Sequence, residues 1–371
     1  GSLQLEMRKK CVGSTWNNRC IGACPQQGHA FLVRGTKMRV LALIINRMLW
    51  LVPTLVGLMV ITFTISHIIP ADPIAFFAGE NATPEQIEAL RVRYGFDKPL
   101  YIQLMNYLIG VTNGDLGISI YTQRPISEDL LSRLPATMEL TFMAVFFSTL
   151  VGIPLGVFAA IYRNSFLDHF LLILTVSGLA IASFWLAILF QLLFAMELQI
   201  TPLQGRIDGW GPEKITGFFI MDSLLVADWE SLQSAFSHLI LPTLTLAFPA
   251  MATIVRFTRA GVLDAINSNY VLYEQAMGLP SKVIIWKYVL RNALIGTVTQ
   301  IGLIFGILIA GAVVVEAVFD WPGLGLYAVE AIMNSDYNAI MGFTLVTGAF
   351  FIIVNLIVDI LHGIIDPRTQ D

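Results

Sequence analysis

Residues 292–317 read NALIGTVTQIGLIFGILIAGAVVVEA, and this stretch decides the fold class. Its only charged residue is Glu316, next to its end. A helix needs roughly 20 consecutive apolar residues to cross the hydrocarbon core of a bilayer. The stretch is long enough for this, and it lacks the polar face at helical spacing that a helix of a soluble protein would show. It is therefore predicted to span a membrane.

Five more stretches have the same character, so the expected fold is an all-α integral membrane protein with six transmembrane helices. The composition agrees, because 56% of the residues are hydrophobic, 13% are charged and the mean hydropathy is +0.72, far above an ordinary soluble domain. The net charge of −4 and the pI near 5.8 give no indication of nucleic-acid binding. The spans are placed at about 40–66, 136–160, 169–196, 239–262, 292–317 and 340–363.

The basic residues indicate how the chain is oriented. With six spans both termini lie on one side of the membrane, and 15 of the 22 Lys and Arg residues fall on that side. The positive-inside rule makes it the cytoplasmic side. We therefore expect a multi-pass protein with both termini in the cytoplasm. The basic residues of the opposite side, spread over much longer loops, are Arg91, Arg93, Lys98, Arg124, Arg133, Arg206 and Lys214.

Around the spans the chain divides into a leader, an external region, a core and a tail. Residues 1–38 are expected to be a disordered leader, and residues 39–66 hold the first transmembrane helix. Residues 67–135 form an external region with short helices, because they are too long for a simple connection. Residues 136–363 form the core with the other five spans, and residues 364–371 are a cytoplasmic tail.

The external region contains signals for short helices. Thr83, Pro84 and Gln86 supply an N-cap hydroxyl, a proline at the first helical position and the glutamine of a capping box. Two further amphipathic stretches, at 99–109 and 126–134, are also predicted to form short helices. These helices either lie on the outer membrane face and contact an external partner, or only cover the end of the bundle.

Two later segments are also placed outside. The loop at about 197–238 is acidic and contains Trp210 and Trp229, which are expected to lie at the membrane interface. The turn at 319–326 is rich in Gly and Pro and leads into a short helix that ends near Asp336.

The sequence lacks the motifs of several classes of enzyme. There is no Gly-x4-Gly-Lys-Ser/Thr phosphate loop, no His-Glu-x2-His and no Gly-x-Ser-x-Gly, which argues against nucleotide hydrolysis, zinc proteolysis and elbow-type serine hydrolysis by this chain. Cys11, Cys20 and Cys24 all lie in the leader, so no disulfide framework supports the fold. Cys20 and Cys24 followed by His29 are only a weak metal-binding pattern.

The spans also lack the groups that an ion-driven carrier needs. Acidic or basic side chains near mid-membrane are costly and are functional by default. Here Glu139, Glu316, Asp359 and His362 all fall near the ends of spans. An energy source outside the membrane is therefore the simpler account.

The segment between the fourth and fifth spans, residues 263–291, is called the inner loop. Asp264 or Asn267 is expected to cap a short helix in it. Gly278 fits the position after that helix, where a positive φ is required. Pro280 prevents the helix from continuing, and a second helix is expected to begin at the next residue and to run into the fifth span.

The short helix of the inner loop is tethered to a long span at each end. If a soluble partner held its exposed side in a groove, any rotation of that partner would tilt the fourth and fifth spans. The alternative is an amphipathic helix that lies on the membrane surface without a partner. The spacing of the residues alone leaves both interpretations open.

A series of short motifs follows the chain in a fixed order. The motifs are HIIPADP at 67–73, YGFDKPLY at 94–101, GDLG at 114–117, RPIS at 124–127, RLPAT at 133–137, Tyr270-Val271 through Ala276-Met277-Gly278, LRNAL at 290–294, EAVFDWPGLG at 316–325 and DPR at 366–368. By their order and spacing, from Arg39 to Arg368, the chain resembles the integral-membrane subunit of bacterial ABC-type peptide importers, the dipeptide/oligopeptide/nickel permease family.

The resemblance implies a fold, a location and a set of partners. The fold would be that of a type I ABC importer permease in the bacterial cytoplasmic (inner) membrane. The partners would be membrane lipid, a homologous second permease subunit in a heterodimer, two cytoplasmic ABC ATPases and an extracytoplasmic solute-binding protein, but no nucleic acid. The chain itself would be no enzyme and would bind no cofactor or metal, since ATP and Mg would be bound by the partner ATPases.

The resemblance also implies a function. The chain would move di- or oligopeptides from the binding protein into the cytoplasm by alternating access. Other solutes of the same family are a nickel chelate, glutathione or an opine-type compound. A different class, the ion-coupled secondary carrier, is disfavoured by the uncharged interiors of the spans.

One segment of the inner loop corresponds to the family's ATPase-coupling loop. Its residues are Tyr270, Tyr273, Glu274, Gln275, Ala276, Met277, Gly278 and Leu279. The sequence departs from the family there, because Leu272, Gln275 and Met277 stand where relatives usually carry basic residues, and Glu274 replaces a small residue. The charge contacts of this loop are therefore expected to differ. No catalytic, metal-binding or substrate-binding residue is assigned.

Overall fold

The computed structural model describes residues 48–66, 83–95 and 97–365 of the chain. Predictions for the leader, for the turn at 67–73, for the side chain of His362 and for the last six residues lie outside what is described. In the described part, the regular structure is helical, and the β structure there is limited to one isolated bridge between Ile118 and Pro125.

Five helices in the described part are long and apolar enough to cross a bilayer, and a bent pair of helices gives a sixth candidate span when its two halves are counted together. This agrees with the all-α architecture and the six spans predicted. The five helical runs are Met48–Ser66, α6 (Ile126–Ile161), α10 (Trp229–Ile266), the run Ser281–Val318 formed by α12 (Ser281–Val283), η2 (Ile284–Val289) and α13 (Leu290–Val318), and α15 (Tyr337–Ile365).

The third span is broken, so the prediction of one uninterrupted helix at 169–196 is wrong. Its parts are α7 (Phe166–Ala180), α8 (Ser183–Phe190) and the π-helical η1 (Gln191–Glu197). The two halves are bent by 105° relative to each other. The bend occurs because Ile181 and Ala182 adopt extended backbone angles, although the apolar run continues through them. Both halves pack against α10.

The external region contains two of the three short helices predicted. In α4 (Pro84–Tyr94), Thr83 and Gln86 form the expected capping box, with the Gln86 N–H donating to the Thr83 hydroxyl at 3.3 Å. The second is α5 (Leu100–Thr112). The stretch 126–134 is not a separate helix, because α6 runs through it and through Pro135 without a break. Proline is tolerated inside membrane helices when neighbouring groups satisfy the freed carbonyl.

The remaining short helices lie in the later loops. They are α9 (Phe219–Val226), α11 (Asn269–Ala276) and α14 (Leu324–Met333). As predicted, α14 follows the Gly- and Pro-rich turn and ends before Asp336, whose carboxylate accepts the Ala339 N–H at the start of α15. Trp210 and Trp229 are both largely exposed, as expected of interfacial side chains.

Small residues let the long helices approach closely. A Cβ on Gly156 of α6 would lie 2.7 Å from the Thr258 Cβ of α10. On α13, Gly302 and Gly306 face α15, and a Cβ on Gly302 would collide with Val358. These two glycines of the fifth span therefore let it pack closely against the sixth span.

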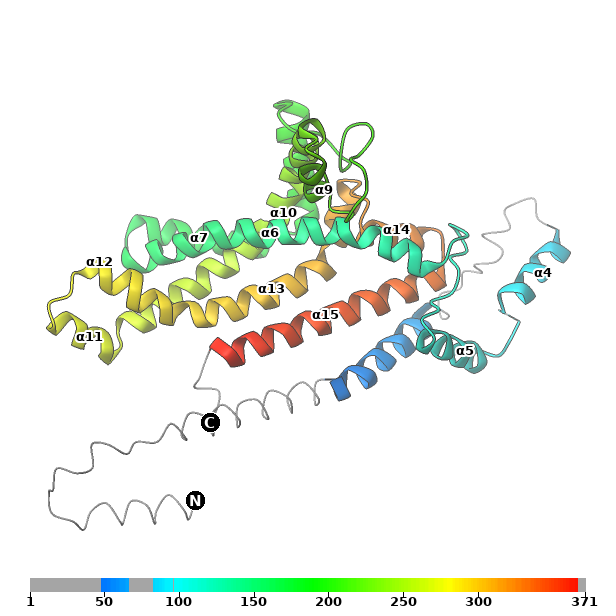
Figure 1. Cartoon of the computed structure of the whole chain (residues 1–371), viewed down its shortest axis with the longest axis horizontal. Coiled ribbons are helices and arrows are strands. Elements are labelled where there is room, and N and C mark those ends of the chain that lie inside the picture. Colours follow the sequence, from blue (N-terminus) through cyan, green and yellow to red (C-terminus); the bar gives the residue numbers. More distant parts are fainter. Residues whose placement is uncertain (1–47, 67–82, 96, 366–371) are drawn as a thin grey trace, which may run out of the picture.

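The long helices α6, α13 and α15 run roughly side by side, and α9 stands above the middle of α6 (Figure 1). The helices α11 and α12 lie at one end, and α14 lies at the opposite end. The helices of the inner loop are thus separated from α14 by the length of the bundle.

Candidate functional site

The helix of the inner loop begins at Asn269, after both of the caps predicted for it. Asp264 lies in the last turn of α10 and Asn267 is the C-cap of that helix. The N-cap of α11 is Ser268, which has extended angles and makes no side-chain cap hydrogen bond. The prediction that Asp264 or Asn267 caps α11 is wrong, because α10 extends through the membrane face and uses both residues itself.

The end of α11 is built as predicted around a glycine. Gly278 has a φ of +77°, a backbone angle that residues other than Gly and Asn rarely adopt. Its N–H donates to the Gln275 carbonyl at 3.0 Å, and the Leu279 N–H donates to the Glu274 carbonyl at 3.3 Å. This pair of hydrogen bonds is the Schellman motif, which ends a helix and turns the chain sharply. Pro280 is then the N-cap of α12.

One side of α11 is fixed to the bundle. Val271 is only 1% exposed and packs with Val157 of α6, Val262 of α10 and Val289 of η2 in one buried cluster. Tyr270 is partly buried against the same cluster. Because apolar burial stabilises by roughly 25 cal/mol per Å², α11 is held to the inner ends of three spans and cannot swing freely from α10.

The opposite side of the inner loop is exposed and apolar. Tyr273 and Met277 are 67% and 66% exposed, and Gln275 and Ala276 are exposed beside them. Exposed apolar groups that gather in one place indicate a partner surface or a membrane contact. The group, called the inner apolar face, consists of Leu272, Tyr273, Met277, Leu279 and Trp286.

Glu274 lies between the two sides of α11. Its side chain is half-buried, and one of its carboxylate oxygens has no hydrogen-bond partner among the described residues. A buried carboxylate oxygen usually has a donor. This oxygen is therefore an acceptor that remains open within the chain. The structure brings all eight residues of the predicted coupling loop together, five of them in α11 and three in the turn that follows.

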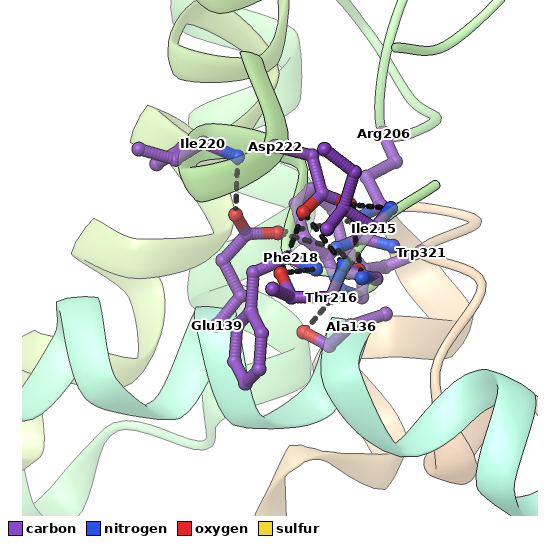
Figure 2. Close-up of polar contacts among 10 residues, drawn as sticks. Ala136, Glu139, Arg206, Ile215, Thr216, Phe218, Ile220, Asp222 and Trp321 are labelled. Atoms are coloured by element: carbon purple, nitrogen blue, oxygen red, sulfur yellow. Dashed lines mark hydrogen bonds and ion pairs between the residues drawn. The ribbon is translucent and has the colours of Figure 1, made fainter. Parts of the chain in front are cut away.

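A second polar cluster lies away from the inner loop, where the segment 198–228 packs on α6 (Figure 2). The carboxylate of Glu139 in α6 accepts hydrogen bonds from Arg206, at 2.5 Å from Nη2 and 3.2 Å from Nε. Its other oxygen accepts the Ile220 N–H at 2.8 Å. The Arg206 guanidinium also lies 3.8 Å from the centroid of the Phe219 ring. Both charged side chains are buried.

Asp222 accepts several hydrogen bonds from other residues of the same segment. Its carboxylate accepts the Thr216 hydroxyl at 2.6 Å and the N–H groups of Thr216, Gly217 and Ile215 (Figure 2). Burial raises the pKa of Asp222, but these hydrogen bonds outweigh it and hold the pKa below its usual value. Burial lowers the pKa of Arg206, yet a guanidinium stays charged in proteins. Segment 198–228 is thus fixed to α6 by an ionised pair.

Glu316, at the end of α13, fixes a different external element. Its carboxylate accepts the Thr137 hydroxyl at 2.7 Å and the Gly325 N–H at 2.6 Å. The N–H of Leu324 donates to the Thr137 oxygen at 2.8 Å. A carboxylate at the first turn of a helix is favoured by the helix dipole. Glu316 therefore holds the N-terminus of α14, and a Cβ on Gly323 would collide with it.

The pairing of Glu139 with Arg206 was missed from the sequence, which placed the two residues at a span end and in an external loop. One signal was present. A carboxylate in an apolar run needs a partner, and Arg206 and Lys214 are the only basic residues of the neighbouring loop at 197–238. The sequence could therefore have limited the partner to these two.

No metal centre is found in the part of the chain that the structure describes, where no three His, Cys, Asp or Glu residues could hold an ion together. The weak pattern of Cys20, Cys24 and His29 lies outside the described residues.

Comparisons with known proteins give consistent results. Residues 152–371 match the family model described as binding-protein-dependent transport system inner membrane component, and residues 40–141 match its N-terminal companion. The probable D,D-dipeptide transport system permease protein DdpB of Escherichia coli K12 is 43% identical over 328 residues, which cover 88% of this chain and 96% of that protein.

Two further relatives cover nearly the same length. The dipeptide transport system permease protein DppB of Escherichia coli K12 is 36% identical over 335 residues, covering 89% of this chain and 99% of DppB. The glutathione transport system permease protein GsiC of Escherichia coli O6:H1 is 35% identical over 327 residues, covering 88% of this chain and 98% of GsiC.

Proposed function

The chain belongs to the binding-protein-dependent transport system inner membrane components, and we propose on this premise that it is the permease subunit of an ATP-driven importer of dipeptides and short oligopeptides. The observation that carries the proposal is the similarity along nearly the full length of permeases named for dipeptides, 43% to DdpB and 36% to DppB. The solute would pass from an extracytoplasmic binding protein into the cytoplasm by alternating access.

The energy would come from two ABC ATPases bound at the cytoplasmic side, with ATP and Mg held by those subunits. The sequence supports this, because it contains no phosphate-binding loop. The inner apolar face gives such a partner a surface to bind, with Tyr273 and Met277 at its centre.

The inner loop would receive the motion of the ATPases and pass it to the fourth and fifth spans. Tyr270 and Tyr273–Leu279 are the residues that we assign to this contact. The burial of Val271 between α6, α10 and η2 supports the assignment, since a helix packed in this way moves with the spans. The Schellman turn at Gly278 supports it too, because its hydrogen bonds fix the angle between α11 and α12.

We propose the remaining assembly from the chain's membership of this family. A homologous second permease would complete the translocation pathway as a heterodimer within the lipid bilayer. The excess of Lys and Arg on the side of the inner loop supports a cytoplasmic location of both termini in the inner membrane. On that orientation, the external clusters at Arg206 and Glu316 lie on the side from which the binding protein would deliver the solute.

The substrate is tested in vesicles that contain this chain, the second permease, both ATPases and the binding protein. We expect uptake of a labelled dipeptide that requires ATP, survives an ionophore that removes ion gradients, and is reduced by excess unlabelled dipeptide. A dipeptide of D-residues is the sharpest competitor because of the 43% identity to DdpB. Uptake that glutathione or a nickel chelate inhibits while dipeptides do not would contradict the peptide assignment, and uptake abolished by the ionophore alone would contradict the ATP-driven class.

A further inference from the structure

A partly buried ion pair joins α7 to the inner end of α10. The Arg259 Nε lies 2.7 Å from Asp168 Oδ1, and its Nη2 lies 2.9 Å from Asp168 Oδ2. Asp168 is 1% exposed. Two parallel hydrogen bonds between a guanidinium and a carboxylate fix both the distance and the angle between the groups. The pair therefore holds α7 and α10 in one relative orientation. Apolar contacts alone would allow the two helices a wider range of angles.

The carboxylate of Asp168 is itself fixed by the start of α7. Ser165 is the N-cap, and its hydroxyl accepts the Asp168 N–H at 3.3 Å. The Asn164 N–H donates to Asp168 Oδ2 at 3.0 Å, in a turn where Asn164 has a φ of +62°. The aspartate thus connects three structures: the turn after α6, the first turn of α7 and Arg259 of α10.

Arg259 stands where α10 meets its neighbours just before the inner loop. On one side of it, Thr258 touches Gly156 of α6. On the other side, Gly261 lies so close to α13 that a Cβ there would be 2.9 Å from the Ala293 carbonyl oxygen. Two turns later α10 ends at Ile266 and α11 begins. A displacement of α11 that is passed on through α10 therefore reaches first the part of α10 that carries Arg259.

The helix at the other end of the ion pair is the first half of the broken third span. It ends at Ala180, and the chain then bends by 105° into α8. The Ile181 N–H closes the end of α7 on the Ser177 carbonyl at 3.0 Å, and the Ala182 carbonyl accepts the Leu186 N–H of α8 at 3.2 Å. The extended residues Ile181 and Ala182 therefore form a hinge between two complete helices. A movement of α7 can change this bend without breaking a helix.

We propose that the Asp168–Arg259 ion pair makes α7 move with the inner end of α10, so that displacement of the inner loop changes the bend of the third span. The inference rests on the proposed function, in which ATPases act on the inner loop. It assigns Asp168 and Arg259 as positioning residues for energy coupling. The solute need not touch either of them.

The first test compares conservative variants in the complete reconstituted importer. Arg259→Lys keeps the charge but loses the two-pronged contact, and Asp168→Asn removes the charge at constant shape. Arg256→Lys is the matched control, because Arg256 is exposed on the same helix. The readout is the amount of solute transported per ATP hydrolysed. This ratio does not depend on the amount of folded complex.

We expect this ratio to fall by about fivefold or more in both pair variants, which is the lower range of coupling between two sites, while Arg256→Lys keeps the wild-type ratio. An unchanged ratio in Arg259→Lys would overturn the inference. Loss of complex assembly in both variants would also overturn it, since the pair would then serve only the fold. Absence of ATP-driven uptake by the wild-type importer would instead refute the proposed function.

The second test measures the movement itself. Spin labels are placed at Phe166 on α7, which is 87% exposed, and at the exposed Asp264 on α10, after Cys11, Cys20 and Cys24 are replaced by Ser. We expect the distance between the labels to stay the same with and without ATP in the wild-type background, and to differ between these states with Asp168→Asn. A distance that changes with ATP although the pair is intact would contradict the inference.

Discussion

The Glu139–Arg206 pair shows how two buried charged side chains fix a loop segment to a helix in this molecule. Both side chains are less than one tenth exposed, and each is surrounded by hydrogen-bond partners that fix the segment 198–228 to α6. Transfer of two charges out of water is costly, so the intact pair adds little net stability. Removal of one partner is different, because it leaves the other charge buried and uncompensated.

We therefore expect Glu139→Ala to lower the free energy of unfolding by about 3–5 kcal/mol and to release the segment 198–228. Trypsin reports the release, since cleavage after the exposed Lys214 in that segment should become faster. Glu128→Ala on the same helix is the control, because Glu128 is exposed, and its effect should stay within about 0.5 kcal/mol. Equal cleavage rates in the two variants would show that the pair does not fix the segment.

Residues could be predicted from the sequence where the cause is local. Gly278 was predicted because a helix end that turns sharply needs a positive φ, a requirement set by a few neighbouring residues. The partner of Glu139 was not, because it lies 67 residues along the chain. The caps proposed at Asp264 and Asn267 failed for a related reason, since tertiary packing extends α10 past both of them.

Among the elements, α13 has two faces with different roles. Gly302 and Gly306 meet α15 without room for a side chain, whereas Gly296 has nothing within 4 Å of where a Cβ would stand. The same residue type therefore serves close packing on one face and leaves the other face open, as a helix that meets a second membrane subunit would.

Gly302→Val should consequently be overpacked against Val358 and lower stability by about 1–3 kcal/mol. Gly296→Val should have little effect on the isolated chain, because open space receives the added side chain. The thermal unfolding midpoint of the purified chain in detergent measures both. Two variants with the same midpoint would argue against the α13–α15 contact.

The apolar pattern predicted where the membrane helices lie. It did not predict where a helix is broken or where two predicted helices are continuous. Length and hydropathy were sufficient to place the spans, since both are properties of a run of residues. The break in the third span was not visible, because Ile181 and Ala182 are neither proline nor glycine and the apolar run passes through them. The fusion of 126–134 with α6 was hidden by Pro135, which usually ends a helix in a soluble protein.

For the whole molecule, buried carboxylates fix segments at both ends of the bundle, Asp168 among them at the inner end, but the inner end also carries an apolar face. The inner end carries an exposed apolar face next to a buried cluster that reaches α6, α10 and η2. At Glu139 and Glu316, buried carboxylates fix external segments to the spans. Such an arrangement suits a permease that is moved from the inner end.

Energy transfer through the inner loop is the central claim, and the ratio of transport to ATP hydrolysis in Gly278 variants tests it most directly. Valine is strained at a φ of +77° by about 1–2 kcal/mol, whereas asparagine tolerates this conformation. In the reconstituted importer, Gly278→Asn should transport as the wild type does, and Gly278→Val should hydrolyse ATP with transport reduced about tenfold. Full transport per ATP in Gly278→Val, or uphill transport by the permease without any ATPase bound, would contradict the account.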